Sequence, residues 1–579
     1  MSLRSLLAVA FYYFSLTAFG QISTFDHFLA HPSSVPGFEG DTFQIHVREK
    51  VATALLDDPN TDYSGRTLIL VHGFSVLSTP IFDAPYLDYS WMDQFAALGY
   101  DVFCMSMTGY GFSSRPAPMN DSCNLGFLDQ LSIGTLCSNP YPFLMTSSDS
   151  EMDDLNTVFD FVHQLRGVNQ SHVFGHSMGG GRVLLYTSRY PDKVDRIITH
   201  GFAGANLPAD PPAMQPAAGN PVGLIRPFIV EEVVLEADCF DQVDPNMIAP
   251  IWQAIQATDT LGPSWDPDGL VRFPLVDLYG LNTDTIESIQ HPVLVLTGEF
   301  DQLAPPFFGS IFYNQIGSSE KLLIEITKTS HTIYWERRQY VVPLLVDEWL
   351  STGQLDEHTI GSAIFKLNDT FDWIGEFDEN EPPKIASTFP ADNAENVELD
   401  IDLLLELNEN INNLGEYMTI FRRSDYSVFQ SLELDANWRV EPICNNLIRF
   451  DIDTLEMNTE YFIYLHFDAF RDRSFNDFEG ILTDKIWNFS TGLLTSSLTL
   501  NDSGPGFRVF PNPAKERIEL QVDAPPANRT FQITNALGQV VHSSLWSGES
   551  LNIQHLSPGI YFISLQREGN WITKKLIKQ

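Results

Sequence analysis

The chain of 579 residues is 44% hydrophobic and 19% charged. This is the composition of folded modules, and the length exceeds one hydrophobic core, so two to four domains are expected. The 75 Asp and Glu residues against 33 Lys and Arg give a formal net charge of −42, which repels phosphate backbones and argues against nucleic acid as a partner. We interpret the acidity as the solvated coat of an exported protein.

The first twenty residues have the order of a secretory signal peptide. Arg4 precedes an apolar run from Leu6 to Phe14, and small residues close the segment at Ala18 and Gly20. The alternative is a membrane anchor, but the apolar run is short for a span. We expect residues 1–20 to direct export, and we expect no stable transmembrane span.

We assign residues 21–380 to one domain, in which short apolar strands alternate with helix-like segments. The strands are the runs "TLILVHG", "YDVFCMSM", "SHVFGHS", "RIITHGFAG" and "PVLVLTGEF". Helical patterns at Asp153–Arg166 and Gly180–Tyr190 lie between them. The alternation predicts a doubly wound, mainly parallel α/β sheet. Two insertions, at about 113–150 and 207–290, are expected to cap the functional site.

Five cysteines in so long a chain do not make a disulfide scaffold. Cys123 and Cys137 flank one irregular segment, and they either close it into a loop or remain unpaired. Cys104, Cys239 and Cys444 lack the spacing of a zinc site. We expect no metal and no organic cofactor.

A serine between two glycines stands where a predicted strand meets a predicted helix. Gly175, Ser177 and Gly179 form the pattern G-x-S-x-G, in which a tight turn exposes the serine hydroxyl. The N-terminus of the following helix directs free N–H groups and a positive dipole end at the same place, where they stabilise an oxyanion. We predict that Ser177 is the nucleophile of an acyl-enzyme.

A serine nucleophile needs a base and an orienting acid. Asp301 follows the apolar strand of "VLVLTGEFD", and His331 follows the last strand, in "LLIEITKTSHTIYWE". The chain order Ser, Asp, His therefore predicts His331 as general base and Asp301 as orienting acid. Glu299 is the competing acid, and we interpret His72 and His176 as framework or oxyanion-loop residues.

The first predicted strand of this set ends in a candidate oxyanion loop. His72, Gly73 and Phe74 follow it directly in "LILVHGFS". We predict that the backbone N–H groups of Phe74 and Met178 form the oxyanion hole.

These motifs resemble those of the α/β-hydrolase superfamily over residues 40–350. The matching stretches are "LVHGF", "TGYGFSSRP", "VFGHSMGGG", "VLVLTGEFD" and "SHTIYWE". The sequence departs from the family in the strand-4 loop, where Met107 or Thr108 stands near the position of a frequent acid or arginine. A serine elbow argues against the dehalogenase and epoxide hydrolase branches, which attack with Asp. It favours carboxylic esters as substrates over amides, lactones and peptide N-termini.

Two small β-sandwiches are expected after the hydrolase-like part. Residues 381–492 open with "PPKIASTFPADNAENVELD", which resembles bacterial Ig-like domains. Their clusters "DANW" and "DIDTLEMNTE" lack the ligand spacing of a calcium loop. Residues 493–506 form a linker. Residues 507–579, with "FRVFPNPAKERIELQV" and "LSPGIYFISL", resemble the C-terminal sorting domain of type IX secretion substrates of Bacteroidetes, which implies export to the cell surface or medium through that machinery.

The leading hypothesis is a secreted serine hydrolase acting on a small-molecule or lipid ester. One alternative is a proline-iminopeptidase-like aminopeptidase, in which Glu231, Glu232 or Glu236 would bind the α-amino group of the substrate. Another is a catalytically inactive surface binding protein. The aromatic and Met-rich insertions predict either an apolar substrate pocket or only the core of a lid.

Overall fold

The computed structural model describes residues 21–578. The exceptions are 76–77, 205, 211–220, 227–241, 267–268, 375–381, 409–410, 415–416, 435–438, 445, 473–475, 493–506, 511–516, 523–528, 536–539, 547–549, 555, 557–558 and 568–569. The predicted signal peptide, Cys239, the "DANW" cluster and the predicted linker 493–506 therefore lie outside the described residues. None of the helices in the described ranges is both long and apolar enough to cross a bilayer.

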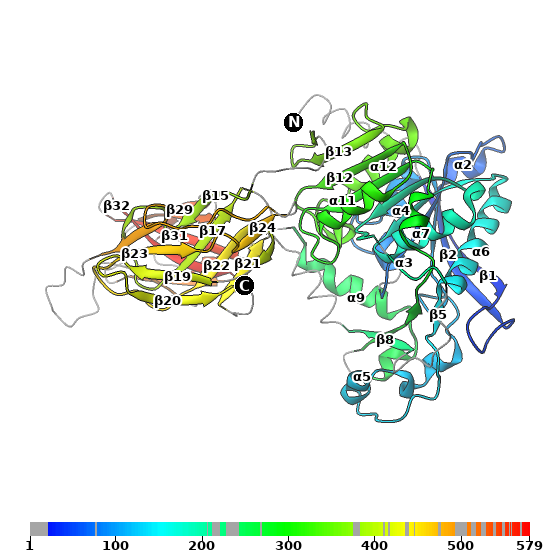
Figure 1. Ribbon diagram of the computed structural model, residues 1–579, viewed down its shortest axis with the longest axis horizontal. Coiled ribbons are helices and arrows are strands. Elements are labelled where there is room, and N and C mark those ends of the chain that lie inside the picture. The colour runs from blue at the N-terminus through cyan, green and yellow to red at the C-terminus, as the bar shows by residue number, and fades with distance from the viewer. Residues whose placement is uncertain are drawn as a thin grey trace. The chain divides into compact units, whose positions relative to one another are not determined.

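A ten-stranded sheet forms the centre of the first part of the chain (Figure 1). Its order is β1 (Ile22–Pro32), β2 (Thr42–Ala52), β4 (Asp101–Met105), β3 (Thr67–Val71), β6 (Ser171–His176), β7 (Val194–His200), β11 (Val293–Gly298), β12 (Lys321–Ile326), β13 (Ile360–Phe365) and β14 (Phe371–Ile374). The strands from β4 to β13 are parallel, whereas β1, β2 and β14 are antiparallel to their neighbours. The doubly wound, mainly parallel α/β fold is confirmed.

The strand order reverses at β3. The chain passes from β3 to β4 on one side of it and returns to β6 on the other. Ligand sites of such sheets lie outside the carboxyl ends of the strands at this switch point. The ends of β3 and β6 carry His72 and Ser177, so the fold places the predicted oxyanion loop beside the predicted nucleophile.

Helices cover both faces of this sheet, since every residue of β3, β4, β6 and β11 is buried. They include α4 (Trp91–Ala97), which contacts α12 (Val341–Thr352), and α6 (Ser148–Arg166), which contacts α7 (Met178–Arg189). α6 begins five residues earlier than predicted. The reason is a capping box. The Ser147 hydroxyl accepts a hydrogen bond from Ser150 N–H, and the Ser150 hydroxyl accepts one from Ser147 N–H, so that two otherwise free N–H groups are satisfied.

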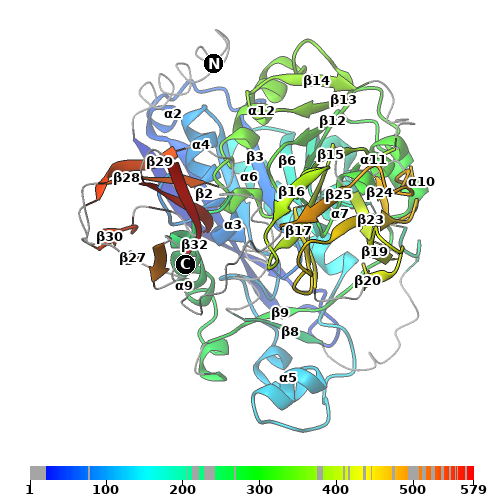
Figure 2. The same ribbon diagram turned by 90° about the vertical axis from the view of Figure 1, so that its left-hand side faces the viewer.

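The two insertions pack on each other. The first carries α5 (Phe127–Ser132), and the second carries α9 (Ile248–Gln256) and the hairpin of β8 (Val222–Ile225) and β9 (Val271–Pro274). In Figures 1 and 2, α5 and β8 lie together at the lower end of this part of the chain. Their shared apolar cluster contains Met119, Leu125, Tyr141, Met145, Val222, Leu224 and Leu270.

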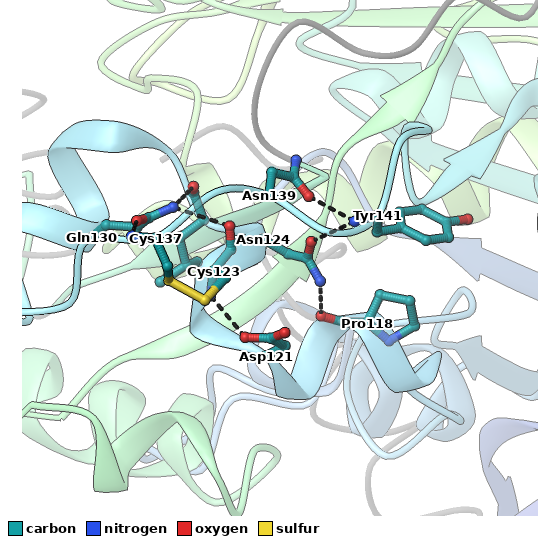
Figure 3. The surroundings of a disulfide bond; sticks show 9 residues. Pro118, Asp121, Cys123, Asn124, Gln130, Cys137, Asn139 and Tyr141 are labelled. Atoms are coloured by element: carbon teal, nitrogen blue, oxygen red, sulfur yellow. Dashed lines mark hydrogen bonds between the residues drawn. A yellow bond between two sulfur atoms is a disulfide. The ribbon is translucent and has the colours of Figure 1, made fainter.

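The cysteine pair left open by the sequence is a disulfide. Cys123 and Cys137 are bonded to each other and close a loop of the first insertion (Figure 3). Cys104 is a free, buried cysteine on β4. Pairing thus constrains an irregular segment that has little regular structure of its own.

Two further sheets share one apolar core after residue 381. One has the order β15 (Ile385–Phe389), β17 (Asp402–Leu407), β22 (Leu447–Asp451), β21 (Val440–Cys444), and the other β16 (Ala394–Val397), β25 (Asn488–Thr491), β23 (Glu460–Leu465), β19 (Tyr417–Arg422), β20 (Val428–Glu433). Strand β17 alternates buried and half-buried residues, as one-sided packing requires. This is a β-sandwich.

The chain divides after Gly492 into two compact units. The second unit is also built of strands, in two sheets around a core of its own. The sheets are β26 (Phe507–Phe510), β27 (Arg517–Val522), β30 (Leu551–Asn552), and β29 (Val540–Trp546), β28 (Arg529–Asn535), β31 (Gly559–Arg567), β32 (Asn570–Lys578). The two predicted β-rich modules are therefore present after the α/β part.

Candidate active site

Ser177 occupies a strained turn between β6 and α7. Its backbone has φ 53° and ψ −126°, a region that non-glycine residues rarely adopt and that is typical of functional sites. Two backbone hydrogen bonds hold it there: Ser177 N–H donates to His200 O (2.7 Å), and Gly180 N–H donates to Ser177 O (2.8 Å). The serine is half-buried at the start of the helix.

The turn needs glycines because backbones approach closely around it. A Cβ at Gly179 would lie 2.4 Å from Val71 O, and a Cβ at Gly73 would lie 2.8 Å from the Cβ of Ser177. Both separations are shorter than real Cβ contacts. The absence of side chains at these positions lets the loop after β3 lie directly against the elbow.

Asp301 and His331 meet at the neighbouring strand ends. Asp301 Oδ2 is 2.8 Å from His331 Nδ1, and the acid is only 1% exposed. Its second oxygen, Oδ1, accepts hydrogen bonds from the N–H groups of Leu303 (3.0 Å) and Ala304 (2.7 Å). A carboxylate oriented in this way keeps the proton of His331 on Nδ1 and leaves Nε2 as the basic nitrogen.

Glu299, the competing acid, is directed elsewhere. Its Oε2 accepts a hydrogen bond from Lys328 N–H (2.7 Å). Of the two acids in "GEFD", Asp301 is therefore the one that the turn after β11 brings to the histidine.

A buried glutamate, not predicted from the sequence, supports the loop before His331. Glu336 is fully buried, and its oxygens accept from Ser330 N–H at 2.9 and 3.1 Å and also from the Ser330 hydroxyl. Burial raises the pKa of Glu336 to about 7. It stands in the stretch "SHTIYWE", so the motif contained it, but only the folded loop shows what it contacts.

Three aromatic side chains pack behind the histidine. His176 Nδ1 lies 3.1 Å from His200 Nδ1, and His176 Nε2 lies 3.3 Å from the Tyr334 hydroxyl. Burial lowers the pKa of His176 well below its usual range and that of His200 to about 3. His176 is thus a neutral, fully engaged ring, packed 4.8 Å from the ring of His331.

The loop after β3 is held by two side chains. Met107 N–H donates to His72 Nε2 (3.2 Å), so the proton of His72 lies on Nδ1 and is donated to Gly73 O (2.8 Å). Arg182 Nη1 donates to His72 O (2.8 Å) and Gly73 O (3.0 Å). These bonds position the backbone immediately before Phe74.

Arg182 is itself paired inside the protein. Its Nε donates to Glu151 Oε2 at 2.9 Å and its Nη2 to Glu151 Oε1 at 2.5 Å, a bidentate contact between α7 and α6. The arginine is 3% exposed and the glutamate 2%. Sequence reasoning missed this pair, although an arginine five residues after the serine, directly before the apolar run Val183–Leu185, was a visible signal.

One cavity joins these elements. Its volume is about 680 Å³, within the range of small-molecule sites. Ser177, His331, Phe74 and Met178 all line it, while Asp301 lies behind the histidine. Its apolar walls include Met152, Leu185, Phe202, Leu207, Leu224, Ile225, Ile255, Phe273, Leu278, Leu281 and Leu303. Part of the predicted cap therefore does form an apolar pocket.

Among the residues with described positions, no three His, Cys, Asp or Glu side chains gather as a metal site would require. The acids proposed for an aminopeptidase, Glu231, Glu232 and Glu236, lie outside the described residues.

Comparisons with known proteins find two family models that match parts of the chain. Residues 66–338 match the model of the alpha/beta hydrolase fold, and residues 508–579 match that of a secretion system C-terminal sorting domain. The monoacylglycerol lipase of Mycolicibacterium smegmatis is 28% identical over 178 residues, 31% of this chain and 61% of the lipase. A bifunctional esterase/perhydrolase of Acinetobacter calcoaceticus is 27% identical over 180 residues, 27% of this chain and 58% of that protein.

The chain thus spans less than two thirds of the length of either of these curated relatives. Among solved structures, an esterase from Thermogutta terrifontis is similar at 17% identity and a TM-score of 0.34, over 56% of this chain and 98% of the esterase.

Proposed function

We propose that the protein is an exported serine hydrolase that cleaves carboxylic esters. The proposal is supported by the match of residues 66–338 to the alpha/beta hydrolase fold and of residues 508–579 to a secretion system C-terminal sorting domain. The observation that carries the proposal is the 2.8 Å contact between Asp301 and His331 beside the cavity that Ser177 lines. It supplies the oriented base that a serine nucleophile needs.

The mechanism follows from these positions. His331 Nε2 accepts the proton of the Ser177 hydroxyl as the serine oxygen attacks the ester carbonyl. The N–H groups of Phe74 and Met178 donate to the carbonyl oxygen as it becomes negative. The alcohol leaves with the proton from His331, and water, deprotonated by the same nitrogen, then releases the acid and restores Ser177. Asp301 stabilises the imidazolium at both steps.

An ester suits the described part of the cavity better than a peptide N-terminus. The carboxylate among its described lining residues is Glu151, and Arg182 neutralises it. A substrate α-ammonium would find no free anion there. Ester hydrolysis also agrees with the names of two of the curated relatives, a monoacylglycerol lipase and an esterase/perhydrolase. The aminopeptidase remains the second candidate.

Labelling with a fluorophosphonate probe tests the nucleophile. We expect heat-sensitive labelling of the full chain that Ser177→Ala abolishes. Ser75→Ala is a matched control, because Ser75 also lines the cavity. Folded protein that takes no label would refute the serine hydrolase and favour an inactive binding protein.

Turnover of p-nitrophenyl esters of increasing chain length, measured beside aminoacyl anilides, tests the substrate class. We expect hydrolysis of the esters. Activity confined to the anilides would overturn the esterase in favour of the aminopeptidase.

A further inference from the structure

The short helix α5 buries a polar side chain and exposes its apolar ones, which is the reverse of an ordinary surface helix. Among its six described residues, the one that is buried is a glutamine, Gln130. Its apolar side chains face outward: Phe127 is 68% exposed, Leu128 77% and Leu131 54%. Leu136, in the same disulfide-closed loop, is 61% exposed. We call Phe127, Leu128, Leu131 and Leu136 the apolar tip. Such a concentration on a surface marks an interaction site.

The loop does not need these side chains to hold its shape. The Cys123–Cys137 disulfide closes it, and the Gln130 amide bridges its two limbs (Figure 3). Gln130 Nε2 donates to the carbonyls of Cys123 (3.0 Å) and Leu125 (2.9 Å), while its Oε1 accepts from Cys137 N–H (2.9 Å). The disulfide and these hydrogen bonds therefore stabilise the loop in place of an apolar core. The exposed apolar side chains are available to contact another surface.

The inner side of the loop packs on a strand that bounds the cavity. Leu125 forms a backbone bridge with Val222 of β8 and packs in one cluster with Leu224. Leu224 and Ile225 line the cavity that contains Ser177. The apolar tip is thus mounted on the strand that bounds the substrate pocket, so whatever the tip contacts is held near the pocket.

The charge of the loop and of the whole chain restricts the kind of partner that the apolar tip can bind. Asp129 is the one ionisable side chain in the segment from Cys123 to Cys137 apart from the bonded cysteines, and Arg226 lies 3.5 Å from its carboxylate. The tip is therefore electrically neutral on a chain of net charge −42, which is repelled by anionic membranes. The partner is uncharged or zwitterionic.

We propose that the apolar tip inserts into the surface of a neutral or zwitterionic lipid aggregate and holds the catalytic cavity against it. The inference rests on the proposed ester hydrolase, and it identifies the substrate as an ester presented by a lipid phase. A lipid surface is favoured over a protein groove because α5 has only six residues, too few to present the i, i+3, i+4, i+7 anchors of a groove-binding helix. A fluid surface accepts a single exposed turn.

Flotation with phosphatidylcholine vesicles tests the surface. Ser177→Ala protein is used, so that binding is measured without turnover. We expect it to float with these vesicles, and we expect Leu128→Ser combined with Leu131→Ser to reduce binding at least about tenfold. The matched control is Leu367→Ser with Leu482→Ser, because these leucines are 61% and 48% exposed away from the tip; it should bind normally.

Failure of this proposal is distinct from failure of the proposed function. Fluorophosphonate labelling reports Ser177 without any lipid. Applied to the tip substitutions in a chain that keeps Ser177, it also shows that these substitutions leave the protein folded. The docking proposal is overturned if the protein does not float, if the tip variant floats equally well, or if phosphatidylglycerol vesicles bind better than phosphatidylcholine. Self-association in gel filtration that the tip variant abolishes, without vesicle binding, would also overturn it and indicate a protein partner.

Discussion

Removing the Arg182 side chain should separate stability from catalysis in this protein. Arg182→Met leaves Glu151 as an unpaired carboxylate that is 2% exposed. Breaking a buried ion pair on one side destabilises proteins by roughly 3–5 kcal/mol. The carbonyls of His72 and Gly73 also lose a donor, so we expect a loss at the upper part of that range.

The double variant Arg182→Met with Glu151→Gln is to be compared with the single variant Arg182→Met. It removes both charges, and replacing a whole buried pair is often nearly neutral in stability. Most of the lost unfolding free energy should return. The hydrogen bonds to the loop before Phe74 stay absent, so kcat should remain reduced, by up to about 10²-fold, with a smaller effect on KM because the loop acts at the oxyanion.

Urea unfolding gives the stabilities, and kcat and KM on a soluble p-nitrophenyl ester give the catalytic effect. Arg182→Lys serves as the conservative variant, since it keeps a positive charge but cannot reproduce the bidentate contact together with the two carbonyl contacts. The reasoning is refuted if the double variant regains full kcat, because the loop would then be positioned without the arginine. A loss of less than about 1 kcal/mol in Arg182→Met would equally contradict it.

Three further predictions follow from the site. Asp301→Asn should lower kcat by about 10⁴-fold by favouring the wrong imidazole tautomer, whereas Glu299→Gln should have little effect; similar losses in both would contradict the assignment of the acid. Gly179→Ala should abolish activity, either because the elbow is displaced in a folded protein or because the protein does not fold, since the new Cβ would lie 2.4 Å from Val71 O. Normal kcat would show that the elbow tolerates a side chain. Burial raises the pKa of Glu336 from 4.5 to about 7, so the unfolded state releases this proton first as the pH rises. The contribution of Glu336 to stability should therefore fall by roughly 3 kcal/mol between about pH 4.5 and 7. In urea unfolding at several pH values, the stability difference between the natural chain and Glu336→Gln should decrease by about this amount over the same range.

Local patterns were sufficient for the fold and for the candidate residues. Apolar strands and the G-x-S-x-G turn depend on neighbours in the chain, because backbone geometry and burial on both faces select residue types within a few positions. They predicted the parallel sheet, which is confirmed, and they named Ser177, Asp301 and His331. The start of α6 was missed by five residues, because a Ser–Ser capping box is a weaker signal than apolar periodicity.

Contacts between distant segments were decided only by the tertiary structure. Arg182 and Glu151 are 31 residues apart on different helices. The sequence named Asp301, but its contact with His331, and the turning of Glu299 toward Lys328, depend on how one turn directs its side chains. The pairing of Cys123 with Cys137, left open by their spacing, and the mounting of their loop on β8 belong to the same class. A sequence supplies the types of groups that can pair, whereas distances, burial and the direction of a side chain arise only when the strands and helices that carry them are packed together.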